Sequence, residues 1–119
     1  MSIELINESE LLNKLEGDGA LLRELIDIFR EQSGPDLQEV LNAVSRQDAE
    51  ALYRAAHKLK GTVSLFGSEE TTEAALALEV MGRDGDLRQA QTAAACLQKH
   101  LEALQQSLAA LKEKHCPKS

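Results

Sequence analysis

The sequence predicts an all-α protein, an antiparallel four-helix bundle with a short additional N-terminal helix. Apolar residues make up 43% of its 119 residues but aromatic residues only 3%, and the apolar positions are mostly Leu and Ala. This composition is typical of helix bundles rather than of β-sandwiches, which use β-branched and aromatic residues. We expect one domain over residues 1–119, with the bundle at about residues 9–112 and a frayed tail at 113–119.

The clearest periodicity lies in the last helical segment. Its apolar residues alternate spacings of three and four: Leu87, Ala90, Ala94, Leu97, Leu101, Leu104, Leu108 and Leu111. Such a heptad seam is typical of helices that cross at small angles in a bundle, and also of a free coiled coil. Because the rest of the chain supplies three more amphipathic segments, we favour an intramolecular bundle and a monomer.

Capping and helix-breaking residues mark the other boundaries. We expect a short helix at about residues 9–15, followed by a long helix that Asp18 caps and Gly34-Pro35 kinks. A third helix should run from Asp48 to Gly67 and a fourth from Ser68 to about Gly82. Asp86 with Gln89 should cap the last helix. The long helix is expected to continue past the proline because the apolar phase resumes at Leu37 and Val40.

Charge and composition exclude several classes of function. A net charge of −7 argues against general nucleic-acid binding, which needs a basic face. No apolar run approaches the roughly 20 residues of a membrane span. Two cysteines far apart do not form a disulfide framework, and the early Glu4, Glu8 and Glu10 do not fit a signal peptide, so we expect a cytoplasmic protein.

The third segment places a histidine opposite its apolar face. At about 100° per residue, one arc holds the apolar side chains and His57 lies across the helix from them, exposed to solvent; the apolar residues are Leu52, Ala55, Ala56, Leu59, Val63 and Phe66. Arg54, Lys58 and Lys60 surround the histidine, which by itself is compatible with an ordinary solvated face. Gly61, one turn on, lowers helix stability and indicates a close approach to the backbone.

These residues form a recognisable motif. The run His57-Lys58-Leu59-Lys60-Gly61, with a second glycine at Gly67, resembles the histidine-containing phosphotransfer (HPt) domains of multistep two-component signalling. The likeness continues at Ala55-Ala56, Leu78-Glu79 and Gly85-Asp86, and covers roughly residues 11–111. It implies a phosphorelay intermediate that accepts a phosphoryl group from a receiver-domain aspartate and passes it to another, a phosphoryl carrier rather than a nucleotide-dependent kinase.

The resemblance also implies a role for each site residue. His57 is the phosphoacceptor, Lys60 stabilises the phosphoryl oxygens, and Gly61 leaves room for the receiver. Glu79 reaches from the next helix to a ring nitrogen and orients the imidazole. Residues expected to contact the partner are Arg54, Lys58, Ser64, Leu65 and Arg83. The expected partners are response-regulator receiver domains or a hybrid sensor histidine kinase; Mg²⁺ belongs to the receiver, and this chain binds no cofactor.

The sequence is compatible with three other interpretations. Cys96 and His100 have the i, i+4 spacing of metal ligands but lack two further ligands nearby, so no metal site is expected. A bundle that binds a partner without chemistry would leave Lys60-Gly61 after His57 as a coincidence. A phosphoacceptor domain of a larger hybrid histidine kinase would use the same chemistry; the start at Met1 and the lack of a linker favour a free-standing protein.

Overall fold

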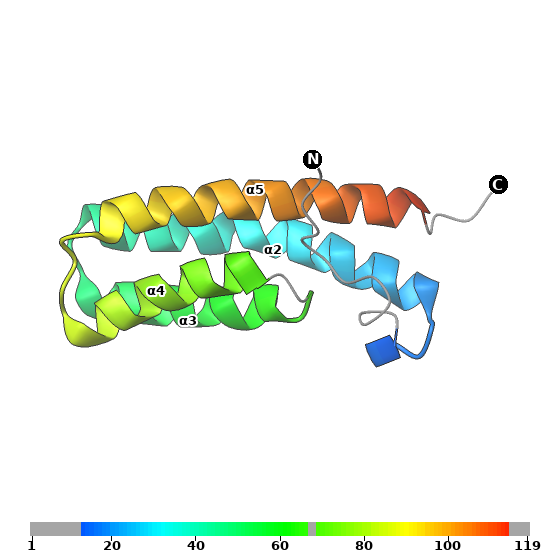
Figure 1. Ribbon diagram of the computed structural model, residues 1–119, viewed down its shortest axis with the longest axis horizontal. Helices are drawn as coiled ribbons and strands as arrows, with labels where there is room; N and C mark the ends of the chain where they lie inside the picture. Colours follow the sequence, from blue (N-terminus) through cyan, green and yellow to red (C-terminus); the bar gives the residue numbers. More distant parts are fainter. Residues whose placement is uncertain (1–12, 67–68, 115–119) are drawn as a thin grey trace.

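The computed structural model describes residues 13–66 and 69–114, and these form an all-α bundle (Figure 1). Its four helices are α2 (Gly19–Ser45), α3 (Ala49–Ser64), α4 (Glu69–Asp84) and α5 (Ala90–Lys114). The prediction of a four-helix bundle is confirmed. The additional helix expected at residues 9–15 lies largely outside the described residues and is not among these four, and the expected boundaries at Gly67 and Ser68 lie outside them as well.

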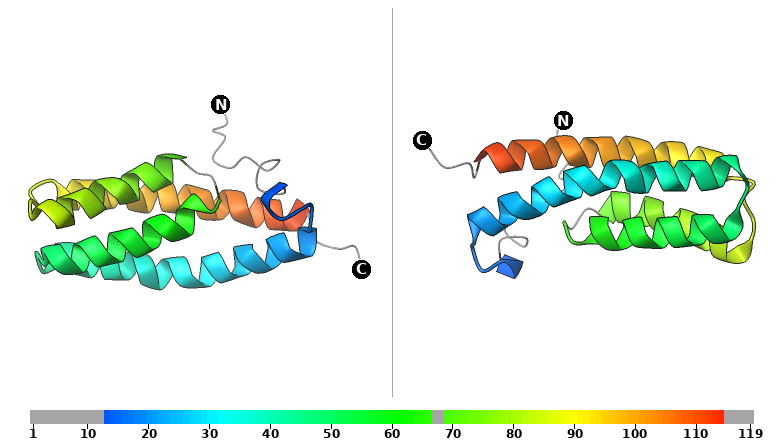
Figure 2. Two further views of the ribbon diagram at one scale, coloured as in Figure 1. Left: turned by 90° about the horizontal axis from the view of Figure 1, so that it is seen from below. Right: turned by 180° about the vertical axis from the view of Figure 1, so that it is seen from behind.

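Each helix packs against two neighbours. α3 contacts α2 and α4, and α5 completes the bundle by contacting α2 and α4. Figures 1 and 2 show neighbouring helices running antiparallel, with α2 beside α5 and α3 beside α4. Because α2 and α5 have 27 and 25 residues but α3 and α4 only 16 each, one end of the long pair projects beyond the short pair.

The predicted helix starts at Asp18 and Asp48 are confirmed. The Asp18 carboxylate accepts a hydrogen bond from the Leu21 backbone N–H at 3.0 Å, and Asp48 accepts one from Ala51 at 3.1 Å. Each bond satisfies a donor that the first turn of a helix leaves free. α2 continues through Pro35 as expected, although proline removes one backbone hydrogen bond, and Figure 2 shows α2 bending along its length.

The last helix begins later than the sequence suggested. α5 starts at Ala90, so Asp86 is not its N-cap. In the turn before α5, the Asp86 carboxylate accepts hydrogen bonds from the backbone N–H of Arg88 at 3.3 Å and from its guanidinium at 2.7 and 2.9 Å. The hydrogen bonds from Arg88 lower the pKa of Asp86 to about 2. At the other side of this connection, α4 runs two residues past Gly82 to Asp84, and Gly85 then adopts a positive φ of 74° that ends the helix.

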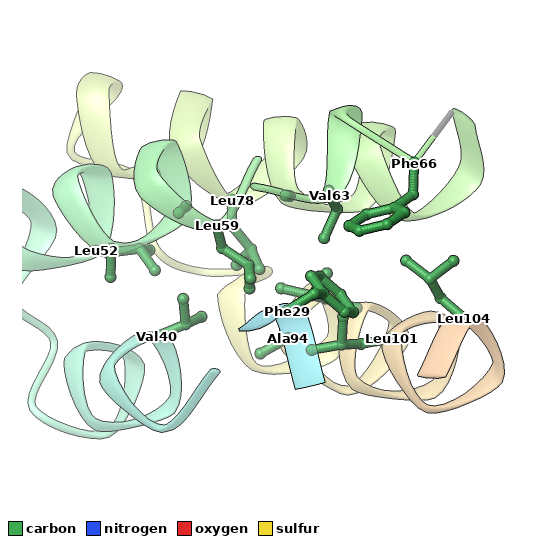
Figure 3. Packing of buried hydrophobic residues seen from close by; sticks show 14 of the residues in the cluster. Phe29, Val40, Leu52, Leu59, Val63, Phe66, Leu78, Ala94, Leu101 and Leu104 are labelled. Carbon is green, nitrogen blue, oxygen red and sulfur yellow. The ribbon is translucent and has the colours of Figure 1, made fainter. Parts of the chain in front are cut away.

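The core follows the apolar periodicity. Within α5, all seam residues from Ala90 to Leu111 are buried, and Leu87 packs against the core from the preceding turn. Phe29 of α2 and Phe66 after α3 meet with their ring centroids 5.1 Å apart and tilted by 60° (Figure 3). A tilted pair at this separation is a favourable aromatic contact. The buried seam of α5 therefore belongs to the intramolecular bundle.

Gly82 allows α4 to approach α3 closely. A Cβ atom added there would lie 2.5 Å from the Tyr53 backbone nitrogen and 2.7 Å from the Ala49 carbonyl oxygen. Both are backbone atoms of α3, which cannot move aside as a flexible side chain can. Gly61 differs, since a Cβ atom there would meet nothing within 4 Å. Close packing between helices therefore accounts for glycine at position 82 but not at position 61.

We expect Gly82→Ala to lower the free energy of unfolding by about 1–3 kcal/mol, because the new methyl group forces the two helices apart. The matched variant Gly61→Ala should raise it by about 0.5–1 kcal/mol through helix propensity alone. Urea unfolding followed by circular dichroism measures both. A Gly82→Ala protein as stable as Gly61→Ala would contradict the close α3–α4 contact.

Candidate functional site

His57 lies on the exposed side of α3, as the helical phase predicted. Its neighbours Ala56 and Leu59 are fully buried, while 60% of the His57 side chain is accessible. Tyr53, one turn earlier on α3, stacks on the imidazole with ring centroids 5.9 Å apart and an angle of 16° between the rings. The histidine is therefore open to a partner molecule on one side and held by an aromatic ring on another.

Glu79 of α4 contacts both His57 and Lys60 of α3. Its Oε2 lies 3.0 Å from His57 Nδ1, and its Oε1 lies 2.9 Å from Lys60 Nζ. The Glu79 side chain is only 12% exposed, so most of the carboxylate is covered while both partners reach it. When Nδ1 carries the proton, it donates to Glu79 and leaves the lone pair on Nε2.

Two opposing effects act on the pKa of Glu79. Burial raises it, and the hydrogen bonds with Lys60 and His57 lower it. Together with the charges of the same two residues, the hydrogen bonds prevail, so the pKa of Glu79 lies below its ordinary value of 4.5. The carboxylate is therefore ionised at neutral pH and presents a negative charge to the Nδ1 side of the imidazole.

The surface one to two turns beyond His57 is small and partly apolar. Among residues 13–66 and 69–114, a Cβ atom at Gly61 would have no neighbour within 4 Å beyond the adjacent backbone of α3. The Ser64 hydroxyl donates to the Gly61 carbonyl oxygen at 3.0 Å, and Leu65, directly after α3, is 38% exposed. This part of the α3 face therefore offers an unobstructed surface next to the imidazole.

The cations predicted to surround His57 each have an acidic neighbour. Arg54 pairs with Glu50 on its own helix at 2.6 Å, and both side chains are about three-quarters exposed. Lys58 Nζ lies 3.3 Å from an oxygen of Asp36 on α2, and this contact raises the pKa of Lys58. These cations remain at the surface, with Arg54 and Lys58 lining a groove between α2 and α3.

Arg83 lies on α4, one turn beyond Glu79, and its side chain is 64% exposed. α4 ends at Asp84, so Arg83 lies in its last turn. Its Nε lies 3.3 Å from Asp84, and it shares a groove with Tyr53 and Gly82. Because Tyr53 stacks on His57, this groove adjoins the histidine.

Sequence reasoning missed three residues around this site. Tyr53 and Asp36 were given no role, and Gly82 was taken only as a helix end. A signal for Asp36 was present: it occupies the buried stripe of α2 with Phe29 and Val40, where a carboxylate is out of place. The close contact at Gly82 depends on how two helices pack, which no local pattern specifies.

Two further properties concern residues 13–66 and 69–114. No group of three or more His, Cys, Asp or Glu side chains lies close enough together there to hold a metal ion. None of the described helices combines the length and apolar character that crossing a membrane requires.

Comparison with known proteins identifies the family. Residues 24–107 match the Hpt domain family, which covers more than half of the chain. The crystal structure of histidine-containing phosphotransfer protein B (HptB) from Pseudomonas aeruginosa PAO1 superimposes with a TM-score of 0.87 at 22% sequence identity, covering 95% of this chain and 98% of that chain. No curated protein shows significant sequence similarity to the chain.

The structural match shows that the two proteins share a fold. The family match confirms the resemblance seen in the motif around His57. The chain therefore belongs to the Hpt domain family, whose members carry out phosphotransfer in phosphorelays.

Proposed function

We propose that this protein accepts a phosphoryl group from the aspartyl phosphate of one receiver domain onto Nε2 of His57 and passes it to the aspartate of another. The observation that carries the proposal is the pairing of an exposed imidazole with a carboxylate on its Nδ1. Of the two ring nitrogens, Nδ1 is engaged by Glu79 and faces α4. Nε2 is then the nitrogen available to a partner.

The transfer step forms one bond to phosphorus and breaks another. The lone pair of Nε2 attacks phosphorus, the N–P bond forms, and the bond between phosphorus and the aspartyl oxygen breaks to release the carboxylate. The imidazole gains positive charge as the N–P bond forms, while the Nδ1 proton stays in place. Glu79, ionised and 3.0 Å from Nδ1, stabilises that charge. The return step is the same sequence in reverse, with a second receiver aspartate as acceptor.

Lys60 supplies positive charge on the same side of α3. Its ammonium lies 2.9 Å from Glu79, and its side chain is 28% exposed, so it can turn from the carboxylate towards solvent. A phosphoryl group on His57 carries three anionic oxygens that compete with Glu79 for this cation. We assign Lys60 the stabilisation of those oxygens, since a loose transition state depends mainly on positioning and charge.

The surroundings of Gly61 fit a docking surface for a receiver. Internal packing gives no reason for a glycine there, because a Cβ atom would meet open space. A glycine that weakens its helix without relieving a clash is explained when a partner approaches the backbone. Ser64 and Leu65 extend this surface, and Arg54, Lys58 and Arg83 supply positive charge around it. That charge complements a receiver's acidic pocket, where we place the Mg²⁺ ion of the reaction.

Incubation with a phosphorylated receiver domain and Mg²⁺ should add one phosphoryl group to the protein. The His57→Gln variant should gain none, because glutamine has no nucleophilic ring nitrogen, and it should fold normally since the side chain is exposed. Intact-mass spectrometry measures the transfer, and the modification should be labile in acid and stable in base. A phosphoryl group on His57→Gln would place the chemistry on another residue.

The charge on Glu79 also predicts a pH dependence of stability. Its pKa is lower in the folded protein than in the unfolded chain, so its contribution is present above the unfolded pKa and is lost as the pH falls through the folded pKa. Glu79→Gln should cost about 1–2 kcal/mol at pH 7, and its difference from the wild type should shrink below about pH 4.

Glu73→Gln is the matched control, because Glu73 is exposed on the same helix. Urea unfolding between pH 7 and pH 3 should show little difference between this variant and the wild type. A Glu79→Gln penalty that stays constant over the same range would mean that the carboxylate charge does not stabilise the site.

A further inference from the structure

The ring of Tyr53 lies against the one side chain that carries the proposed chemistry. Tyr53 and His57 are four residues apart on α3, which places them on adjacent turns of one face. Their rings are nearly parallel, at 16°, with centroids 5.9 Å apart. Tyr53 is half-buried, whereas His57 is exposed.

We propose that Tyr53 is a positioning residue for phosphoryl transfer, which holds the plane of the His57 imidazole and stabilises the positive charge that the ring gains. This inference rests on the proposed function of His57. It adds a second constraint to the one from Glu79. The carboxylate fixes which nitrogen faces α4, and the stacked ring fixes the plane in which the other nitrogen points outward.

An exposed histidine without such contacts would change rotamers freely. Ordering a side chain costs conformational entropy, and in this protein the stack and the Nδ1 contact with Glu79 oppose that cost before any partner arrives. A nucleophile that is already oriented loses less freedom when the reacting atoms meet. Tyr53 thus contributes to the rate without touching the phosphoryl group.

The stack also responds to the charge of the ring. Neutral imidazole becomes cationic as the Nε2–P bond forms. A cation within about 6 Å of an aromatic centroid is attracted by the negative face of that ring. The separation of 5.9 Å meets this limit. Because the attraction grows as the charge develops, it favours the transition state over the free protein.

The side chain of Tyr53 can be changed without altering the close contact between α3 and α4. Its backbone, rather than its side chain, forms the close contact with Gly82. A change of side chain at position 53 therefore leaves the α3–α4 contact in place. Tyr53→Leu removes the aromatic face and keeps an apolar side chain with good helix propensity, and Tyr53→Phe keeps the face and removes only the hydroxyl.

The donor for the test is phosphoramidate, a small molecule that needs no docking surface. Nε2 attacks its phosphorus, the P–N bond breaks, and ammonia leaves with the proton that it requires from water. We expect Tyr53→Leu to react about three- to tenfold more slowly than the wild type, and Tyr53→Phe within about twofold of it. His57→Gln defines the background, and circular dichroism verifies that each variant folds.

Nuclear magnetic resonance supplies an independent readout. The stacked ring should shift the His57 ring-proton resonances upfield in the wild type and in Tyr53→Phe, and this shift should disappear in Tyr53→Leu. Wild-type reactivity of Tyr53→Leu, or equal slowing of the Phe and Leu variants, would overturn the inference. Normal reaction with phosphoramidate but no transfer from any receiver would instead count against the proposed relay function, and the comparison of variants would still decide the role of Tyr53.

Discussion

The close approach of α4 to α3 is the constraint on which the site depends. Gly82 lets the helices meet at the backbone of Tyr53, where a single methyl group would collide with main-chain atoms. Glu79 lies just under one turn from Gly82 on α4, and His57 lies one turn from Tyr53 on α3. The contact at Gly82 therefore sets the separation at which the Glu79 carboxylate meets the His57 imidazole at 3.0 Å. The packing of α4 against α3 therefore determines the geometry of the contact between Glu79 and His57.

Two carboxylates near the histidine form ion pairs between helices. Glu79 of α4 serves both His57 and Lys60, and the buried Asp36 of α2 holds Lys58. Each carboxylate is more buried than the cation it holds, so the acidic groups lie beneath a basic surface. In a chain with a net charge of −7, this layering places Lys58 and Lys60 outside the carboxylates that they contact.

Much of the fold could be read from local patterns. The seam of α5 and the caps at Asp18 and Asp48 were predictable because each depends on residues within one or two turns. The cap expected at Asp86 was wrong because α5 begins only at Ala90, and the Asp86 carboxylate binds the backbone and the guanidinium of Arg88 in the preceding turn. The exposure of His57 followed from helical phase alone, whereas the roles of Tyr53 and Gly82 required knowing which parts of two helices face each other.

The central claim is that Glu79 holds Nδ1 and leaves Nε2 to accept the phosphoryl group. The most direct test is to phosphorylate ¹⁵N-labelled protein and identify the modified ring nitrogen from its coupling to ³¹P by nuclear magnetic resonance. We expect a bond to Nε2, with Nδ1 still protonated and facing Glu79. A phosphoryl group on Nδ1 would contradict it, because that nitrogen could react only after losing its contact with the carboxylate.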